Sequence, residues 1–296
     1  MELRLTGARG GSISASSRER RPARAGAAPP RAKKRFGQHF LSDPSILNRI
    51  VDAAELAPGA TVIEVGAGYG GLTEALAVRG ARVIALEVDR DLVPLLRDRF
   101  AGRPNVTIVE ADALDVTPGD VLARAGLAAP YSVVANLPYN IAAAVLRSFL
   151  EAEMPPQRLV VMVQREVAEA IVAKPGKMSL LSVATQVYGE TRLVMRVAPG
   201  SFSPPPKVDS AVVRIDVSPR PRVDVPLDVF FRVVRAGFGN PRKQLRNSLS
   251  YGLHVKQDVV DAALRAAGID VTLRPQVLSL DGWAAITRAW IARPNQ

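Results

Sequence analysis

The 296-residue sequence contains no cysteine and only two histidines, His39 and His254. The absence of cysteine excludes disulfide bonds, cysteine-based metal clusters and thiol nucleophiles. Long apolar runs are absent too, since a run such as LVVMV at 159–163 is far shorter than the roughly 18 residues that span a bilayer. We therefore expect a cytoplasmic protein with no membrane anchor and no bound metal.

Acidic residues are outnumbered, because 28 Asp and Glu stand against 39 Lys and Arg, a net charge of +11. The excess is uneven: residues 1–35 carry +8, residues 36–217 carry −3 and residues 218–296 carry +6. An anionic partner is expected to meet the first and last of these segments. Residues 1–35 have too little apolar surface to fold alone, which predicts a disordered basic tail. An organellar transit peptide and an over-long gene start are the alternatives.

From residue 61 onward, short β-branched runs alternate with helical periodicity. Runs this apolar are typical of strands that are covered on both faces of a parallel sheet. Amphipathic segments at 89–100 and 141–153 lie between them, so the order is βαβαβ and the predicted class is α/β, doubly wound. The runs are TVIEV (61–65), RVIAL (82–86), VTIVE (106–110), YSVVAN (131–136) and RLVVMV (158–163).

Two further strands are predicted at 190–197 and 210–217, joined by the proline-rich loop SFSPPPKVD (201–209), and together they indicate an antiparallel edge. After about residue 217 the strands stop and a 3.6-residue period predicts helices at 228–238, 256–268 and 280–292. We therefore expect three parts: a tail (1–35), a sheet domain (36–217) and a small all-helical domain (218–296).

A glycine-rich loop, EVGAGYGGLT (64–73), follows the first strand and precedes a helix. Glycines such as Gly66 let a ligand approach the backbone at the N-terminus of that helix. By itself the pattern fits nicotinamide, flavin and S-adenosylmethionine (SAM) proteins, and it also fits a tight turn without a ligand.

Acidic residues follow the next two strands. Glu87 lies 21 residues after Gly66, where a carboxylate can accept hydrogen bonds from both hydroxyls of a ribose. Asp89 is the alternative for the sugar, but its place at the head of a turn favours a helix cap. Asp112 follows the third strand and can accept a hydrogen bond from the exocyclic amine of an adenosine. A solvated loop acid is the other interpretation of Asp112.

The string NLPY (136–139) ends the fourth strand. Pro138 fixes its own φ and biases Leu137 toward extended backbone, which presents a carbonyl and the Asn136 amide oxygen as acceptors beside the Tyr139 ring. Two acceptors on an adenine amine would draw its nitrogen toward tetrahedral geometry and aim the lone pair at a methyl group, while the ring stacks on the base. A strand-ending turn with a buried tyrosine is the alternative.

Two other segments combine basic residues with histidine or amide side chains. In KKRFGQHFL (33–41), no second histidine lies near His39, so we interpret it as a structural or ligand-packing residue and not as a metal ligand. In NPRKQLRNSL (240–249), we expect Arg242, Lys243 and Arg246 on one helical face that suits phosphate oxygens. A solvated basic helix is the alternative.

Together these strings resemble the RsmA/KsgA family of ribosomal RNA adenine dimethyltransferases. The resemblance runs in order and at compatible spacing from Arg35 to the C-terminus. It rests on RFGQHFL (35–41), EVGAGYGGLT (64–73), EVDRDL (87–92), EADALD (110–115), NLPYNI (136–141), FSPPPKVDSAVVRI (202–215) and RKQLRNSL (242–249).

The resemblance implies an enzyme that uses SAM to add two methyl groups to each of two adjacent adenosines in the 3′-terminal hairpin of small-subunit (16S) rRNA during ribosome assembly. We expect the enzyme to be a monomer. It also implies a Rossmann-like, seven-stranded methyltransferase sheet with a reversed last strand, followed by a helical domain that recognises rRNA. Carried over by position, the SAM contacts are His39, Leu41, Gly66, Glu87, Asp112 and Asn136. The target adenine is held by Asn136, Leu137, Pro138 and Tyr139, with Phe202 as a second aromatic contact. His39 stands where many members carry asparagine, and both side chains can donate a hydrogen bond.

Three other functions share parts of this pattern. A resistance-type enzyme of the same superfamily would modify an adenine of large-subunit rRNA, but PPPKVDSAVV and RKQLRNSL favour the small subunit. A nicotinamide oxidoreductase has a similar sheet but no use for NLPY. A non-catalytic assembly factor would not need the complete glycine loop and NLPY set.

Overall fold

The computed structural model describes residues 39–41 and 43–293. The basic tail predicted at 1–35 therefore lies outside the described residues. The second of the chain's two units, residues 32–296, contains both the sheet and the C-terminal helices. The predicted division at residues 217 and 218 lies inside this second unit and stays a prediction.

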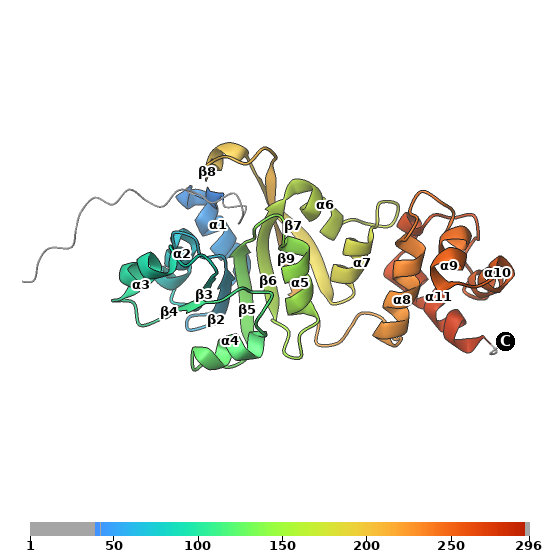
Figure 1. The fold of residues 1–296 in the computed structure, drawn as a ribbon, viewed down its shortest axis with the longest axis horizontal. Coiled ribbons are helices and arrows are strands. Elements are labelled where there is room, and N and C mark those ends of the chain that lie inside the picture. The colour runs from blue at the N-terminus through green and yellow to red at the C-terminus, as the bar shows by residue number, and fades with distance from the viewer. Residues whose placement is uncertain (1–38, 42, 294–296) are drawn as a thin grey trace, which may run out of the picture. The chain divides into compact units, whose positions relative to one another are not determined.

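A seven-stranded mixed sheet forms the centre of the second unit (Figure 1). Its spatial order is β4-β3-β2-β5-β6-β9-β7. The first five strands are parallel, whereas β9 runs antiparallel to both neighbours, which confirms the predicted antiparallel edge. The strands are β2 (Thr61–Val65), β3 (Arg82–Glu87), β4 (Val106–Glu110), β5 (Tyr131–Asn136), β6 (Arg158–Gln164), β7 (Gly189–Val197) and β9 (Ser210–Val217).

Helices cover both faces of the sheet because successive strand residues point to opposite sides and nearly all are apolar. In β2, for example, Val62 packs with α1, α2 and α3, whereas Ile63 packs with α4, α5 and α6. A short helix, α7, follows α6. The seven helices are α1 (Pro44–Ala54), α2 (Gly71–Val78), α3 (Val93–Phe100), α4 (Pro118–Arg124), α5 (Ala142–Leu150), α6 (Arg165–Ile171) and α7 (Leu180–Gln186).

Two short strands lie apart from the main sheet. β1 (Phe40–Leu41) pairs antiparallel with β8 (Phe202–Ser203), with Leu41 opposite Phe202. This pairing joins the start of the described chain to the proline-rich loop, although more than 160 residues separate them. A 3₁₀ turn, η2 (Pro199–Ser201), directly precedes β8.

Four helices follow the last strand and enclose a separate apolar cluster around Trp283, Phe230 and Leu264. Met178, just before α7, and Val183, within α7, belong to the same cluster and connect it with the sheet layer. No helix among residues 39–41 and 43–293 is both long and apolar enough to cross a bilayer. The elements are α8 (Leu227–Phe238), α9 (Leu245–Leu253), α10 (Gln257–Ala266), η3 (Pro275–Val277) and α11 (Leu280–Ala292).

The helix predicted from residue 89 begins later, at Val93. The side chain of Asp89 accepts a hydrogen bond from the Asp91 amide (3.1 Å), and its carbonyl accepts from Leu92 (2.9 Å). These bonds form a turn that precedes the helix. Asp89 is thus a turn residue next to Glu87. Its interpretation as a helix cap was wrong, because the N-cap of α3 is Leu92.

Candidate active site

The order of the strands reverses between β2 and β5, because β3 and β4 follow β2 on one side while β5 and β6 lie on the other. In open α/β sheets, ligands bind outside the carboxyl ends of the strands at such a switch point. The predicted site residues Gly66, Glu87, Asp112 and Asn136 all lie at or just beyond these ends.

The glycine loop between β2 and α2 is shaped by residues in the left-handed region. Gly66 has φ 77° and Gly70, the N-cap of α2, has φ 79°. A Cβ at position 70 would lie 2.6 Å from the Phe100 ring, so both conformation and space require glycine there. The Gly66 amide donates to the Leu86 carbonyl (2.9 Å), which ties the loop to the end of β3.

Glu87 is 4% exposed and holds the same loop through its carboxylate. One oxygen accepts from the Gly68 amide (2.8 Å) and the other from the Asp89 amide (2.9 Å). Burial raises the pKa of Glu87, and the two amides partly oppose that rise. Each oxygen has a second lone pair, so the carboxylate can still accept hydrogen bonds from a sugar.

Glu64 is a residue that the sequence reasoning missed. It is 1% exposed and accepts a hydrogen bond from the Thr73 hydroxyl on α2 (2.5 Å), which links the two ends of the glycine loop. Burial, with the nearby Glu87 as a smaller cause, raises the pKa of Glu64 to about 8. The signal in the sequence was a lone carboxylate inside the apolar run TVIEV.

We expect Glu64 to make stability depend on pH. Its pKa is 4.5 when unfolded and about 8 when folded, so the folded chain keeps a proton that the unfolded chain releases. The free energy of unfolding of wild type, relative to that of a Glu64→Gln variant, is therefore highest below pH 4.5. It falls as the pH rises toward 8, by at most about 1.4 kcal/mol per pH unit. When thermal midpoints are measured at pH 5, 7 and 9, the midpoint of the variant should rise relative to that of wild type as the pH increases. Parallel curves would contradict this assignment.

Asp112 follows β4, which pairs with β3 so that Glu87 and Glu110 are in register. One Asp112 oxygen accepts from the Leu114 amide (2.9 Å), which fixes the carboxylate in a turn. The Ala111 amide bonds to the Glu87 carbonyl (3.1 Å) and holds the two strand ends together. Glu87 and Asp112 thus end adjacent strands at the edge where a nucleoside would lie.

Asn136 ends β5 beside the glycine loop. A Cβ on Gly66 would lie 3.8 Å from the Asn136 carbonyl and from Pro138 Cδ, so NLPY and the loop are neighbours. Asn136 Nδ2 donates to the His39 carbonyl (3.1 Å). Because the amide nitrogen is used in this bond, the orientation of the amide leaves Oδ1 as the acceptor.

Tyr139 lies between two polar neighbours. Its hydroxyl is hydrogen bonded to Ser210 at the start of β9 (2.5 Å), and its ring stacks with His39 at a centroid separation of 5.7 Å. His39 Nδ1 lies 2.9 Å from the Pro204 carbonyl in the proline-rich loop. One histidine therefore contacts the loop and both ends of NLPY, in agreement with its interpretation as a packing residue.

Comparisons with known proteins identify the family of this chain. The profile described as "Ribosomal RNA adenine dimethylase" matches residues 30–292. The chain belongs to this family. "Ribosomal RNA small subunit methyltransferase A" of Dehalococcoides mccartyi is 45% identical over 265 residues, covering 89% of this chain and 90% of the relative. The Geobacter sulfurreducens protein of the same name is 43% identical over 88% of this chain and 96% of its own.

Two solved structures share the fold of this dimethylase. "23S rRNA methyltransferase ErmE" has a TM-score of 0.67 and 30% identity and covers 84% of this chain and 98% of its own. A "dimethyladenosine transferase" from Plasmodium falciparum has a TM-score of 0.69 and 22% identity and covers 84% and 96%. The predicted class, an α/β Rossmann-like methyltransferase sheet with a C-terminal helical region, is confirmed.

Three residues that are predicted to hold the target adenine differ in how exposed their side chains are. Leu137 is 1% exposed and its amide donates to the Met162 carbonyl (3.1 Å), so its side chain belongs to the core and its contact with a target base stays a prediction. Pro138 is half-buried against Gly66. Phe202 is 4% exposed within the α1–α2 core layer, and its contact with a target base stays a prediction.

The prediction that Arg242, Lys243 and Arg246 share one helical face was wrong. Residues 240–243 form a turn and bends, Gln244 is extended, and α9 begins only at Leu245. Arg246 is on the helix, where it pairs with Asp261, which is 6% exposed. Two contacts with distant residues accompany this difference: the Leu245 amide donates to the Leu273 carbonyl (2.7 Å), and the buried carboxylate of Asp261 uses the Arg246 guanidinium. Arg242 and Lys243 are exposed.

Ser210 was also missed, because a serine opening a strand gives no signal. We expect Ser210→Ala to lower kcat of this dimethylase about tenfold and to leave the Kd of SAM unchanged, since the Tyr139 ring would lose its anchor. Adding Tyr139→Phe to Ser210→Ala should cause little further loss, because both changes break one bond. Fully additive losses in single-turnover assays would show that the bond does not position the ring.

Proposed function

We propose that this chain is a SAM-dependent rRNA adenine N6,N6-dimethyltransferase that acts on two adjacent adenosines in the 3′-terminal hairpin of 16S rRNA, in the cytoplasm during ribosome assembly. One observation carries the proposal: the Asn136 amide, fixed by the His39 carbonyl, lies beside Tyr139 and next to the glycine loop. An amide oxygen suited to accept from an adenine amine, and an aromatic ring beside it, support this proposal.

The residues at the sheet edge fit SAM. Glu87 is a buried carboxylate with lone pairs for two sugar hydroxyls, and Asp112 on the next strand can accept from an adenine amine. Gly66 has no side chain where the loop faces Asn136. Leu41 packs against the core beside Gly71 and borders the same loop. SAM, when bound, would supply an electrophilic methyl group.

Asn136 Oδ1 would accept one N–H of the target amine, and a backbone carbonyl of the NLPY turn would accept the other. These bonds favour a tetrahedral nitrogen and turn its lone pair away from the base plane. The His39 ring lies over one face of Tyr139, so a base would stack on the opposite face. Geometry therefore supplies most of the proposed catalysis.

The proposed transfer does not need a side-chain general base. Burial raises the pKa of Tyr139, so its hydroxyl stays protonated at neutral pH. The amine proton becomes acidic once the nitrogen is methylated and can then leave to solvent. Among the described residues, no group of three or more His, Asp or Glu side chains is arranged to hold a metal ion.

The choice of the small subunit is supported by relatives named "Ribosomal RNA small subunit methyltransferase A" at 39–45% identity. The alternative is a large-subunit enzyme, because ErmE is named for 23S rRNA and is 30% identical. We assign residues 36–217 to catalysis and residues 218–296 to rRNA recognition, with Arg242 and Lys243 as phosphate contacts. The chain is expected to act as a monomer.

Methyl transfer to separated ribosomal subunits tests this proposal. Undermethylated small and large subunits are incubated with the protein and SAM labelled in its methyl group, and the rRNAs are then isolated. We expect the label in 16S rRNA alone. Label confined to 23S rRNA would favour the alternative, and no label in either RNA would contradict both.

A further inference from the structure

A hollow of about 550 Å³ lies between α8 and the end of α9, away from the sheet edge that carries the glycine loop and NLPY. Its lining includes Arg232 and Arg235 of α8, Asn240 of the connection, and Tyr251 of α9. A second hollow of about 530 Å³ shares Asn240 and continues to Arg242 and Lys243. The two hollows are therefore adjacent along the α8–α9 connection.

The helical period places the charged residues of α8 on one face. Asp228, Arg232 and Arg235 are spaced by four and three residues, so they follow one another along the helix surface that lines the hollow. Both arginines are exposed, and the Arg235 guanidinium lies 5.8 Å from the Phe231 ring centroid. The face thus presents two planar guanidinium groups to solvent.

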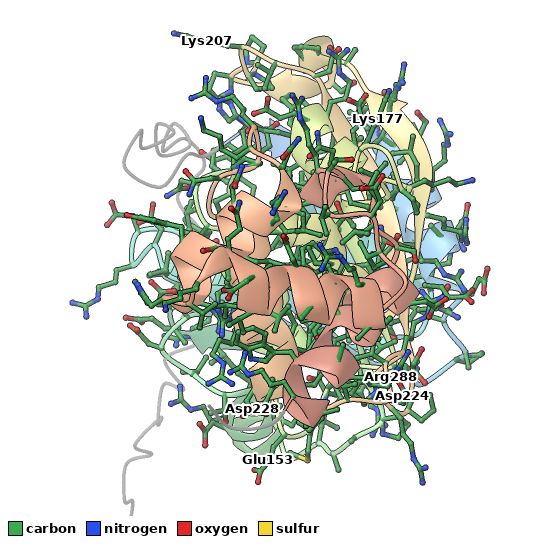
Figure 2. The ribbon with its side chains drawn as sticks, turned by 90° about the vertical axis from the view of Figure 1, so that its right-hand side faces the viewer. Glu153, Lys177, Lys207, Asp224, Asp228 and Arg288 are labelled. Carbon is green, nitrogen blue, oxygen red and sulfur yellow. The ribbon has the colours of Figure 1, made fainter. Side chains whose placement is uncertain are left out.

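In the described part of the chain, the cations that line the two hollows are available to an anionic ligand. Within residues 39–41 and 43–293, no acidic group forms an ion pair with Arg232, Arg235, Arg242 or Lys243. By contrast, Arg288 of the same helical region pairs with Asp224, and the two lie side by side in Figure 2. Asp228, labelled in the same view, is the acid in the lining of the first hollow. The two hollows together have a net positive lining suited to an anion.

Tyr251 gives the hollow an aromatic surface. Its side chain is 74% exposed, although an aromatic ring normally gains from burial. The His254 ring lies 6.5 Å from it, centroid to centroid. Exposed rings beside arginines are the combination on which unpaired bases stack in single-stranded nucleic acid sites.

The floor of the hollow is backbone. A Cβ on Gly252 would lie 2.7 Å from the Ala236 Cα, so a glycine is required for α9 to pack this closely on α8. Gly252 and Ala236 both line the hollow, and neither has a side chain that fills it. A flat group can therefore enter next to Tyr251.

We propose that this hollow binds one unpaired nucleotide of the rRNA substrate. The base of this nucleotide stacks on Tyr251, and Arg232 and Arg235 hold the phosphates on its two sides. This assignment rests on the proposed function and adds to it a second RNA-binding site away from the methylated adenine. Asn240 can donate and accept hydrogen bonds at the edge of the base. Arg242 and Lys243 would hold the strand as it leaves toward the second hollow.

Binding of full-length variants to protein-free 16S rRNA, measured over a range of salt concentrations, tests the assignment. Tyr251→Ala is expected to weaken binding about tenfold at every salt concentration, and Tyr251→Phe should bind like wild type because it keeps the stacking face. The Arg232→Ala/Arg235→Ala double variant should lower the slope of log Kd against log salt by about 1.4, since two phosphate contacts are lost. Arg265→Ala, which removes an exposed arginine of α10 outside the hollow, is the matched control and should keep the wild-type slope.

Equal affinities for Tyr251→Ala and Tyr251→Phe would overturn the stacking assignment. Losses seen only with assembled particles, and not with protein-free rRNA, would indicate an acidic protein partner and would also overturn it. Failure of the proposed function has a different signature: wild type would transfer no methyl group to the small subunit, while Tyr251→Ala would still weaken RNA binding. The Kd of SAM serves as a folding control and should be the same for every variant.

Discussion

Replacing Asn136 with alanine is expected to lower kcat for methylation of small-subunit rRNA about 100- to 1000-fold. The expectation follows from the loss of an oriented acceptor at the reacting nitrogen, an effect of the size seen when one positioned hydrogen-bonding group is removed from an active site. Asn136 is the last residue of β5, and its Nδ2 bonds to the His39 carbonyl across the site. Removing the side chain should therefore leave the sheet intact.

Asn140→Ala is the matched control for this change. Asn140 lies next to Tyr139, has the same side chain and is exposed, and we expect its removal to leave kcat within about twofold of wild type. Single-turnover rates with saturating SAM, together with thermal midpoints, separate chemistry from folding. Wild-type turnover in the Asn136→Ala variant would show that lone-pair alignment by this amide is not part of catalysis.

Replacing Glu87 with alanine is expected to weaken SAM binding by about 10- to 100-fold. The side chain is buried at the end of β3, and a hydrogen bond to a charged group contributes about 1.5–3 kcal/mol. The same change removes the acceptors of the Gly68 and Asp89 amides, so the thermal midpoint should fall as well. Calorimetric titration at low temperature measures the affinity while the variant is folded.

Glu110→Ala provides the comparison, because Glu110 is in register with Glu87 on β4 but is exposed and paired with Arg90 (3.2 Å). We expect its Kd for SAM to equal that of wild type. If both variants bind SAM alike, or if Glu87→Ala keeps full affinity, the assignment of Glu87 to the ribose is wrong.

The strands of the main sheet could be predicted from the sequence because most of them are short apolar runs. β2, β4, β5 and β9 begin and end at the predicted residues. Their carboxyl ends then brought Gly66, Glu87, Asp112 and Asn136 to one edge, since that follows from parallel order alone. The site was predictable to the extent that it depends on strand ends.

Contacts between distant segments could not be predicted. The bonds of His39 to Pro204 and of Tyr139 to Ser210 join residues 165 and 71 positions apart, and neither depends on a local pattern. Arg246 was assigned to RNA because its charge is visible in the sequence. Its pairing with the buried Asp261 cannot be seen there. Sequence patterns report periodicity and charge, but they do not report which charges the fold neutralises.

The central claim is methylation of two adjacent adenosines of 16S rRNA, and mass spectrometry of the 3′-terminal fragment tests it most directly. Undermethylated small subunits are incubated with the protein and SAM, and the fragment containing the terminal hairpin is isolated and sequenced by mass. We predict two methyl groups on each of two neighbouring adenosines, and only a small fraction of that methylation in the same time with Asn136→Ala. An unmodified fragment, or methyl groups on any other nucleotide, would contradict the account.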